Sequence, residues 1–110
     1  MIIVIDTTDK ECEVGFFDGA NIDRIKWRWR EDTGSEVLRN IQKLLEKGQK
    51  KLENIEAIFV NQGPGSYTGT RVGITIASTL GWSLNIPVEG YSSKDFRVSK
   101  KNHFPAPIYE

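Results

Sequence analysis

The fold of this chain is decided around the sequence Gly63-Pro64-Gly65-Ser66-Tyr67-Thr68-Gly69-Thr70-Arg71-Val72-Gly73. An apolar segment at 55–60 precedes it and a helix predicted at about 69–84 follows it, so it connects a strand to a helix. Its glycines and its proline set a tight backbone path. Such a loop can present N–H groups to an anion at the helix N-terminus. A simpler interpretation is a structural connection in which Ser66 or Thr68 caps the helix.

Two well-known glycine-rich loops do not match this stretch. A P-loop requires Gly-Lys followed by Ser or Thr, and that combination occurs nowhere in the sequence. The dinucleotide-binding fingerprint requires a third glycine three residues after the second. Here Gly63 and Gly65 are followed at that position by Thr68. Both nucleotide-binding interpretations are therefore excluded for this loop.

Outward from the loop, the pattern predicts a mixed α/β domain. Apolar runs or alternation predict strands at 2–5, 11–17, 25–30, 55–60 and from 87, with a hairpin turn at Asp18-Gly19. Helical spacing predicts helices at about 34–47 and 69–84, the first with a capping box at Thr33-Gly34-Ser35-Glu36. Ser92-Ser93 could cap a third helix, and 98–107 is expected to be irregular. The order β-β-β-α-β-α-β predicts a single lobe with a mixed five-stranded sheet, as in the ribonuclease H-like fold of the actin-like ATPase superfamily.

Composition narrows the function classes. The chain has 110 residues with 15 Lys and Arg against 15 Asp and Glu, which argues against a protein that grips nucleic acid alone. One Cys and one His cannot build a zinc site, so we expect no metal and no cofactor. No segment is long enough to span a membrane. We expect a cytoplasmic protein with Cys12 in its core.

Three motifs resemble one family. The stretch 63–73 is similar to the signature of the TsaB (YeaZ) family, with Tyr67 and Val72 as mild departures. The opening Ile5-Asp6-Thr7-Thr8 and the later Ile86-Pro87-Val88-Glu89-Gly90-Tyr91-Ser92-Ser93 resemble two further family motifs in the same order. Gly34 departs from the family, which usually begins the first helix with His-Ser-Glu. The resemblance covers about residues 1–95.

The resemblance implies a partner subunit and not an enzyme. The family belongs to the actin-like ATPase superfamily but is generally considered catalytically inactive. Its members pair with TsaD, which transfers threonylcarbamoyl to an adenosine beside the tRNA anticodon, and the ATPase TsaE joins them in bacteria. Pairing uses the two helices of the N-terminal lobe, homodimers use similar surfaces, and tRNA is contacted only indirectly. We therefore expect residues 1–97 to form that lobe and 98–110 to be a tail, for which one interpretation is the vestige of a second lobe.

The second predicted helix is the best candidate for the partner surface. No charged residue occurs between Val72 and Val88, although a surface helix normally shows one polar face. Small residues recur at every fourth position, which lets another helix approach closely. An alternative is that this small-residue stripe packs on the sheet. The predicted interface residues are Val37, Ile41, Leu44, Gly69, Gly73, Ile74, Ala77, Leu80 and Gly81.

Other residues keep two interpretations. Asp6, Thr7 and Thr8 form either a strand-ending turn or the remnant of a phosphate-binding turn. Arg71 opposes the helix dipole, so we expect it to pair with Asp6 or Glu89, or else with an acidic group of a partner. The basic row formed by Arg24, Lys26, Arg28 and Arg30 indicates a solvated edge strand, or alternatively a tRNA contact. The competing function is an actin-like small-molecule kinase half-domain that acts as a dimer.

Overall fold

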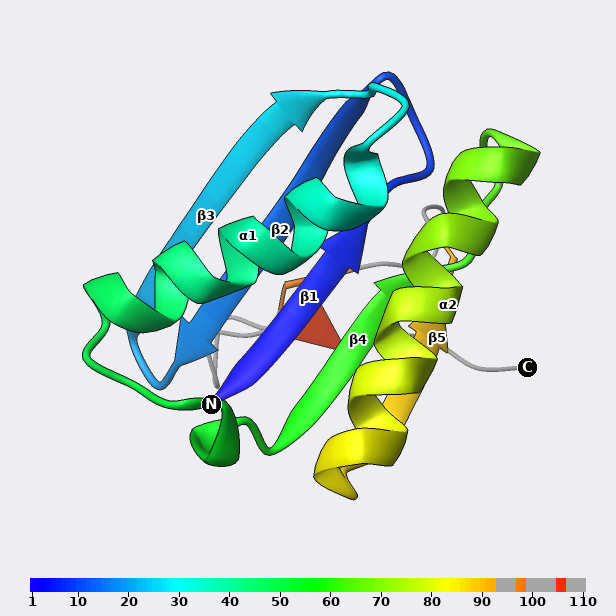
Figure 1. Ribbon diagram of the computed structural model, residues 1–110. Coiled ribbons are helices and arrows are strands. Elements are labelled where there is room, and N and C mark those ends of the chain that lie inside the picture. The colour runs from blue at the N-terminus through cyan, green and yellow to red at the C-terminus, as the bar shows by residue number, and fades with distance from the viewer. Residues whose placement is uncertain (93–96, 99–104, 107–110) are drawn as a thin grey trace.

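A computed structural model describes residues 1–92, 97–98 and 105–106 of the chain (Figure 1). Strands and helices follow each other in the predicted order up to residue 91. Their bounds are β1 Ile2–Asp6, β2 Glu11–Asp18, β3 Asn21–Arg28, α1 Thr33–Lys47, β4 Ala57–Asn61, α2 Tyr67–Leu84 and β5 Val88–Tyr91. A short 3-10 turn, Leu52–Asn54, precedes β4. Two further strands of two residues each are β6, Arg97–Val98, and β7, Pro105–Ala106.

The main sheet has the strand order β3-β2-β1-β4-β5. The hairpin strands β2 and β3 are antiparallel to their neighbours, whereas β4 pairs in parallel with both β1 and β5. Strand β1 is therefore central and is buried along most of its length, as its continuous apolar run predicted. The predicted mixed five-stranded sheet and its ribonuclease H-like arrangement are confirmed.

Both helices lie on the same face of this sheet (Figure 1). Helix α1 packs over β2 and β3, and α2 packs over β4 and β1. The main core fills the space beneath them, with Ile3, Ile5, Val14 and Ile58 pointing up from the strands. Cys12 is fully buried, as predicted. Because β1 and β4 run in parallel, their carboxyl ends meet at one edge, where the loop between β4 and α2 begins.

The helix ends differ slightly from the predictions. Helix α1 starts at Thr33, and its N-cap Asp32 makes no side-chain capping bond. The predicted capping box is therefore wrong: the Thr33 hydroxyl instead accepts a hydrogen bond from the Arg30 N–H at 2.9 Å. Helix α2 starts two residues earlier than predicted, and Ser66 caps it by accepting from the Gly69 N–H at 3.1 Å.

The predicted orientation of α2 is wrong. The small-residue stripe faces the sheet, where Gly69, Gly73, Ala77 and Gly81 are the buried residues of the helix. A Cβ atom on Gly73 would lie 2.5 Å from the Thr7 Oγ1 atom, and one on Gly81 would lie 2.2 Å from Val88. The helix backbone thus lies too close to the strands for larger side chains. The small residues serve close helix-on-sheet packing within the chain.

The remaining predicted interface residues also point inward. The inner side of α1 carries three of them, Val37, Ile41 and Leu44, which are buried in the main core. The other two, Ile74 and Leu80 of α2, are half-buried against the same core. Because helix α1 has one apolar stripe, that stripe covers the sheet and is not available to a partner.

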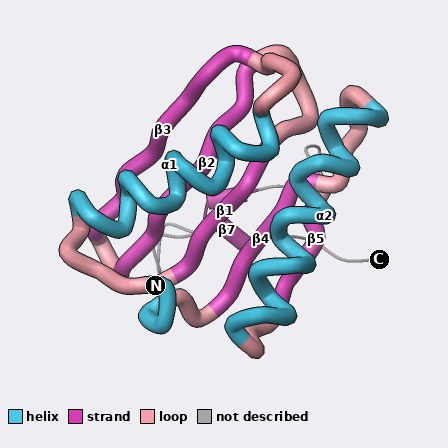
Figure 2. The backbone as a smooth tube through the Cα atoms, in the orientation of Figure 1, coloured by secondary structure: helices cyan, strands magenta, loops and turns pink. Residues whose placement is uncertain are grey.

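The opposite face of the sheet carries a second, smaller apolar cluster. Val4, Phe17 and Tyr91 are buried there, with Ile2 and Phe59 packed against them. The two-stranded ladder of β6 and β7 lies on this side, away from the helices (Figure 2). The helix predicted after Ser92-Ser93 and most of the predicted tail lie outside the described residues.

Candidate functional site

The glycine-rich loop is fastened to the turn that follows β1. The Ser66 N–H donates to the Thr8 carbonyl at 2.7 Å, and the Thr7 hydroxyl donates to the Gly69 carbonyl at 2.5 Å. A Cβ on Gly65 would lie 2.4 Å from the Thr8 carbonyl oxygen, and one on Gly69 would lie 2.2 Å from that of Thr7. Only glycine permits this approach. The loop therefore ties the start of α2 to the end of β1.

The carboxylate of Asp6 is engaged within the chain. Its Oδ1 atom accepts from the Thr8 N–H at 3.0 Å and from the Thr8 hydroxyl at 2.7 Å. Its Oδ2 atom accepts from the Asn61 side-chain N–H at 3.1 Å, and the Oδ1 atom of the same Asn61 side chain accepts from the Gly63 N–H at 2.9 Å. These bonds support the interpretation of Asp6, Thr7 and Thr8 as a strand-ending turn.

An open cleft of about 650 Å³ lies beside this turn. Its lining carries four carboxylates but only two ammonium groups, so its charge disfavours an anionic ligand such as a bare phosphate. Among the residues that the structure describes, no three His, Cys, Asp or Glu side chains converge to hold a metal ion. The cleft is lined by Asp6, Thr8, Asp9, Lys10, Glu11, Glu13, Lys26, Pro64, Gly65 and Ser66.

The outward side of the two helices forms a different surface. Five exposed side chains follow one another along α2 at intervals of three or four residues, which places them on one stripe. Leu38 of α1 is 48 % exposed and lies one helical turn after Gly34, where an added Cβ would meet Val72 and Ile76 of α2. We define the α1–α2 surface by Leu38, Tyr67, Arg71, Thr75, Ser78 and Trp82.

Two aromatic side chains stand out on the α1–α2 surface. Trp82 is 86 % exposed and Tyr67 is 75 % exposed, although large aromatic side chains are normally well buried. Between Tyr67 and the start of α1 lies a groove of about 490 Å³. It is lined by Gly34, Tyr67, Thr68, Arg71, Val72, Thr75 and Ile76.

Arg71 stands at the rim of this groove without a carboxylate partner among the described residues. Its Nη1 atom donates to the Tyr67 hydroxyl at 3.2 Å, and its guanidinium carbon lies 5.3 Å from the centre of the Tyr67 ring. The predicted pairing with Asp6 or Glu89 is therefore wrong within the described structure. Asp6 is occupied by Thr8 and Asn61.

Two of the four residues in the predicted basic row, Arg24 and Lys26, lie opposite carboxylates of β2. Arg24 lies 3.4 Å from a carboxylate oxygen of Glu13, and Lys26 lies 3.6 Å from one of Glu11. Cross-strand pairs of this kind are ordinary features of an exposed sheet. The solvated-edge interpretation of this row gains support from these contacts.

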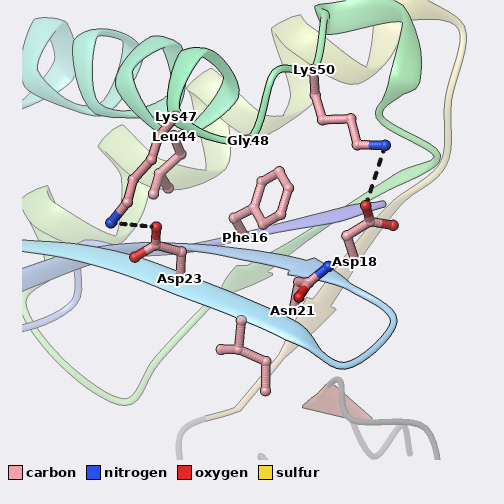
Figure 3. A pocket seen from close by; sticks show the side chains of 9 residues that line it. Phe16, Asp18, Asn21, Asp23, Leu44, Lys47, Gly48 and Lys50 are labelled. Atoms are coloured by element: carbon pink, nitrogen blue, oxygen red, sulfur yellow. Dashed lines mark ion pairs between the residues drawn. The ribbon is translucent and has the colours of Figure 1, made fainter.

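A further pocket of about 470 Å³ lies between the β2–β3 hairpin and the end of α1 (Figure 3). Lys47 reaches Asp23 at 2.9 Å, and Lys50 reaches Asp18 at 3.4 Å. The Lys47 ammonium holds the pKa of Asp23 below its usual value by hydrogen bonding to it. Since all four charges are paired, these contacts are best explained as a clamp that holds the hairpin against the helix.

Sequence reasoning did not identify the exposed stripe as an interface. The predicted interface contained none of Tyr67, Arg71, Thr75, Ser78 and Trp82, because the small-residue spacing indicated a different side of the helix. The aromatic residues at either end of α2 were the available signal, since two large aromatic side chains on one stripe of a helix indicate a binding surface.

None of the described helices is long and apolar enough to cross a membrane.

Comparison with known proteins shows which families this chain is similar to. The family model TsaD, described as tRNA N6-adenosine threonylcarbamoyltransferase, matches residues 34–104. The tRNA threonylcarbamoyladenosine biosynthesis protein TsaB of Bacillus subtilis (strain 168) is 43 % identical over 61 residues, covering 53 % of this chain and 27 % of that protein. The protein of the same name from Escherichia coli (strain K12) is 32 % identical over 93 residues, covering 84 % of this chain and 40 % of its own length.

A solved structure shares the fold. YeaZ from Pseudomonas aeruginosa superposes with a TM-score of 0.78 at 24 % identity, over 83 % of this chain and 43 % of that chain. This chain therefore spans less than half the length of these relatives. On the strength of the matching family model, the TsaB relatives and the shared fold, the chain belongs to the TsaB (YeaZ) family within the wider group of TsaD-related proteins.

Proposed function

We propose that the chain is a non-catalytic partner subunit that binds a TsaD protein through its α1–α2 surface in tRNA threonylcarbamoyladenosine formation. Its curated relatives are named for biosynthesis of that nucleoside. In this proposal TsaD carries out the transfer, TsaE joins the full complex, and tRNA reaches the chain only through its partners. The protein acts in the cytoplasm, where tRNA is modified.

The exposed aromatic stripe on α2 is the observation that carries this proposal. Trp82, 86 % exposed, is the most exposed of the large apolar side chains in the described structure. Exposed Trp and Tyr residues are enriched where proteins bind one another, because they bury large areas at a low entropic cost. The remaining positions of the stripe are small and uncharged except for Arg71. A partner can therefore desolvate this surface with only one charge to satisfy.

The competing proposal, a kinase half-domain, finds less support in the turn that follows β1. Asp6 is the residue that a phosphate-binding turn would offer to a nucleotide, and three internal hydrogen bonds occupy it. The adjoining cleft is lined with more carboxylates than ammonium groups. Both features favour a structural role for this turn.

A calorimetric titration of the chain with TsaD from the same organism tests the proposal. Replacing Trp82 by Ala removes an exposed side chain, so the fold should remain intact while the proposed interface loses a large aromatic contact. Truncation of such a residue typically costs about 2 kcal/mol or more, equivalent to a loss of affinity of roughly 30-fold. Circular dichroism checks that the variant is folded.

Leu52→Ala is the matched control, because Leu52 is also an exposed apolar residue, 42 % exposed, but lies outside the α1–α2 surface. It should bind TsaD as tightly as the unaltered chain. Equal binding by Trp82→Ala and the unaltered chain would show that TsaD docks elsewhere. The same measurements in the absence of TsaD test the expected self-association, which Trp82→Ala should weaken if homodimers use this surface.

A further inference from the structure

We propose that Arg71 is the specificity-determining residue of the α1–α2 surface and that it binds an Asp or Glu carboxylate on the partner subunit. The partner segment should also carry an aliphatic side chain next to that carboxylate, which enters the groove beside Arg71. This inference rests on the proposed function and adds the chemistry by which the partner is recognised.

The charge of Arg71 is uncompensated within the described structure. Arg71 is the fifth residue of α2, close to the N-terminal end of the helix, where the helix dipole offers a cation no stabilisation. The described residues offer its guanidinium no carboxylate; its recorded contacts are with the ring and hydroxyl of Tyr67. One donating contact leaves most of the five guanidinium N–H groups open to an acceptor. An exposed cation without a carboxylate partner among the described residues is complementary to an anion outside the chain.

The contact with Tyr67 fixes where the guanidinium lies. Tyr67 precedes Arg71 by one helical turn, so its ring and hydroxyl hold the arginine along the stripe. An arginine that stacks on an aromatic ring keeps its planar edge free for a bidentate contact with a carboxylate. The pair therefore presents an ordered cation and not a freely rotating one.

The groove beside Arg71 is suited to an aliphatic neighbour of that carboxylate. Its volume is about 490 Å³, and Val72 and Ile76 line it from α2. Gly34 of α1 faces these side chains across the groove. A Cβ atom there would contact both Val72 and Ile76, so the glycine keeps this part of the groove open. A partner carboxylate at the rim would pair with Arg71, and a neighbouring Leu, Ile or Val would fill the groove.

Charge argues for a different protein and not a second copy of this chain. Helix α2 contains no acidic residue, so a symmetric contact centred on α2 would bring two Arg71 side chains together without a carboxylate from either α2. The nearest acidic residues of α1 and its cap, Asp32 and Glu36, already pair with Arg39 at 3.2 Å and 3.5 Å. A heterologous partner that supplies the carboxylate avoids this repulsion.

Titration of TsaD from the same organism with the unaltered chain, Arg71→Gln and Arg28→Gln tests the inference. Arg28 is a matched control, because it is an exposed arginine on β3, outside the α1–α2 surface. Arg71→Gln should lower the affinity by about 10- to 100-fold, as expected for loss of a charged hydrogen-bonded pair. Arg28→Gln should leave it unchanged. Raising NaCl from about 50 to 500 mM should weaken the unaltered complex more than the Arg71→Gln complex, because salt screens the charge pair.

A stability measurement separates recognition from folding. Arg71→Gln should melt at about the same temperature as the unaltered chain, because Arg71 is exposed and a surface substitution of this kind changes stability little. If the unaltered chain binds TsaD and Arg71→Gln binds equally well, the inference is wrong while the proposed function stands. If Arg71→Gln weakens only a homodimer, the occupant is a second copy and the inference is also wrong. If the unaltered chain does not bind TsaD, the proposed function fails and this inference with it.

Discussion

Replacing Gly69 by Ala distinguishes the two possible orientations of α2 by the sign of its effect on stability. If the small-residue stripe faced solvent, the substitution would stabilise the helix by up to about 1 kcal/mol, because alanine is the better helix former. In the structure the added Cβ would lie 2.2 Å from the Thr7 carbonyl oxygen. That oxygen belongs to the backbone and cannot turn away as a flexible side chain would.

The expected cost follows from these contacts. Forcing an extra methyl group into a packed site typically costs about 1–3 kcal/mol. Any shift of Gly69 also disturbs the hydrogen bond from the Thr7 hydroxyl to its carbonyl, worth about 1 kcal/mol. After the gain in helix propensity is subtracted, we expect Gly69→Ala to lower the free energy of unfolding by about 2 kcal/mol. For a domain of this size that corresponds to a fall in melting temperature on the order of 10 °C.

Thermal and urea unfolding followed by circular dichroism provide the measurement. Ser78→Ala is the control, because Ser78 is exposed on the same helix. It should change the free energy of unfolding by no more than about 0.5 kcal/mol. A Gly69→Ala variant that is as stable as the unaltered chain, or more stable, would refute the packing of α2 described here.

Three further predictions concern other parts of the lobe. Asn61→Ala should lower the free energy of unfolding by about 1–3 kcal/mol in urea titrations, because it removes partners of both Asp6 and the Gly63 N–H in a buried site; unchanged stability would show that this network is unimportant. The Asp23–Lys47 pair lowers the pKa of Asp23 from 3.8, so its contribution should be complete above about pH 4 and lost as the pH falls through the folded-state pKa. Melting curves of Asp23→Asn should accordingly fall less on acidification than those of the unaltered chain, and parallel curves would contradict this. Burial, with Asp6 and Asp9 nearby, raises the pKa of the Cys12 thiol to about 11, so a thiol reagent near pH 8 should label the chain only after unfolding; rapid labelling of the native chain would contradict the buried placement.

The sequence was sufficient to predict the order of elements because each one has a clear period or a clear boundary. The apolar run of β1, the alternation of β3 and the glycine-rich loop each specify one local structure. Taken together, these local structures are compatible with few topologies, because the crossover between parallel strands must be right-handed. The resemblance of the loop to a family signature then agreed with the comparisons.

The orientation of α2 could not be derived in the same way. A helix normally shows its outer face by its charged residues, and Arg71 is the only charged residue of α2. The small-residue stripe suited either another helix or the sheet. The close approach of Gly73 to Thr7 and of Gly81 to Val88 decides between them. These contacts are long-range in the sequence and are visible only after the chain has folded.

The contacts of Arg71 were also inaccessible to sequence reasoning. Sequence reasoning offered Asp6 or Glu89 within the chain, or else an acidic group of a partner, but Asp6 is satisfied by Thr8 and Asn61. The structure therefore removes Asp6 as a partner of Arg71, and pairing with an acidic group of another protein stays a prediction. An exposed cation without a carboxylate partner among the described residues is therefore the structural feature on which the proposed partner contact rests.

Quantification of threonylcarbamoyladenosine in cellular tRNA tests the central claim most directly. Nucleosides from cells depleted of this protein would be analysed by mass spectrometry, beside cells in which the unaltered protein is restored. A role as a TsaD partner predicts that threonylcarbamoyladenosine falls several-fold on depletion and recovers with the unaltered protein, and that recovery is poorer with Trp82→Ala. A normal level of the nucleoside after depletion would contradict the account.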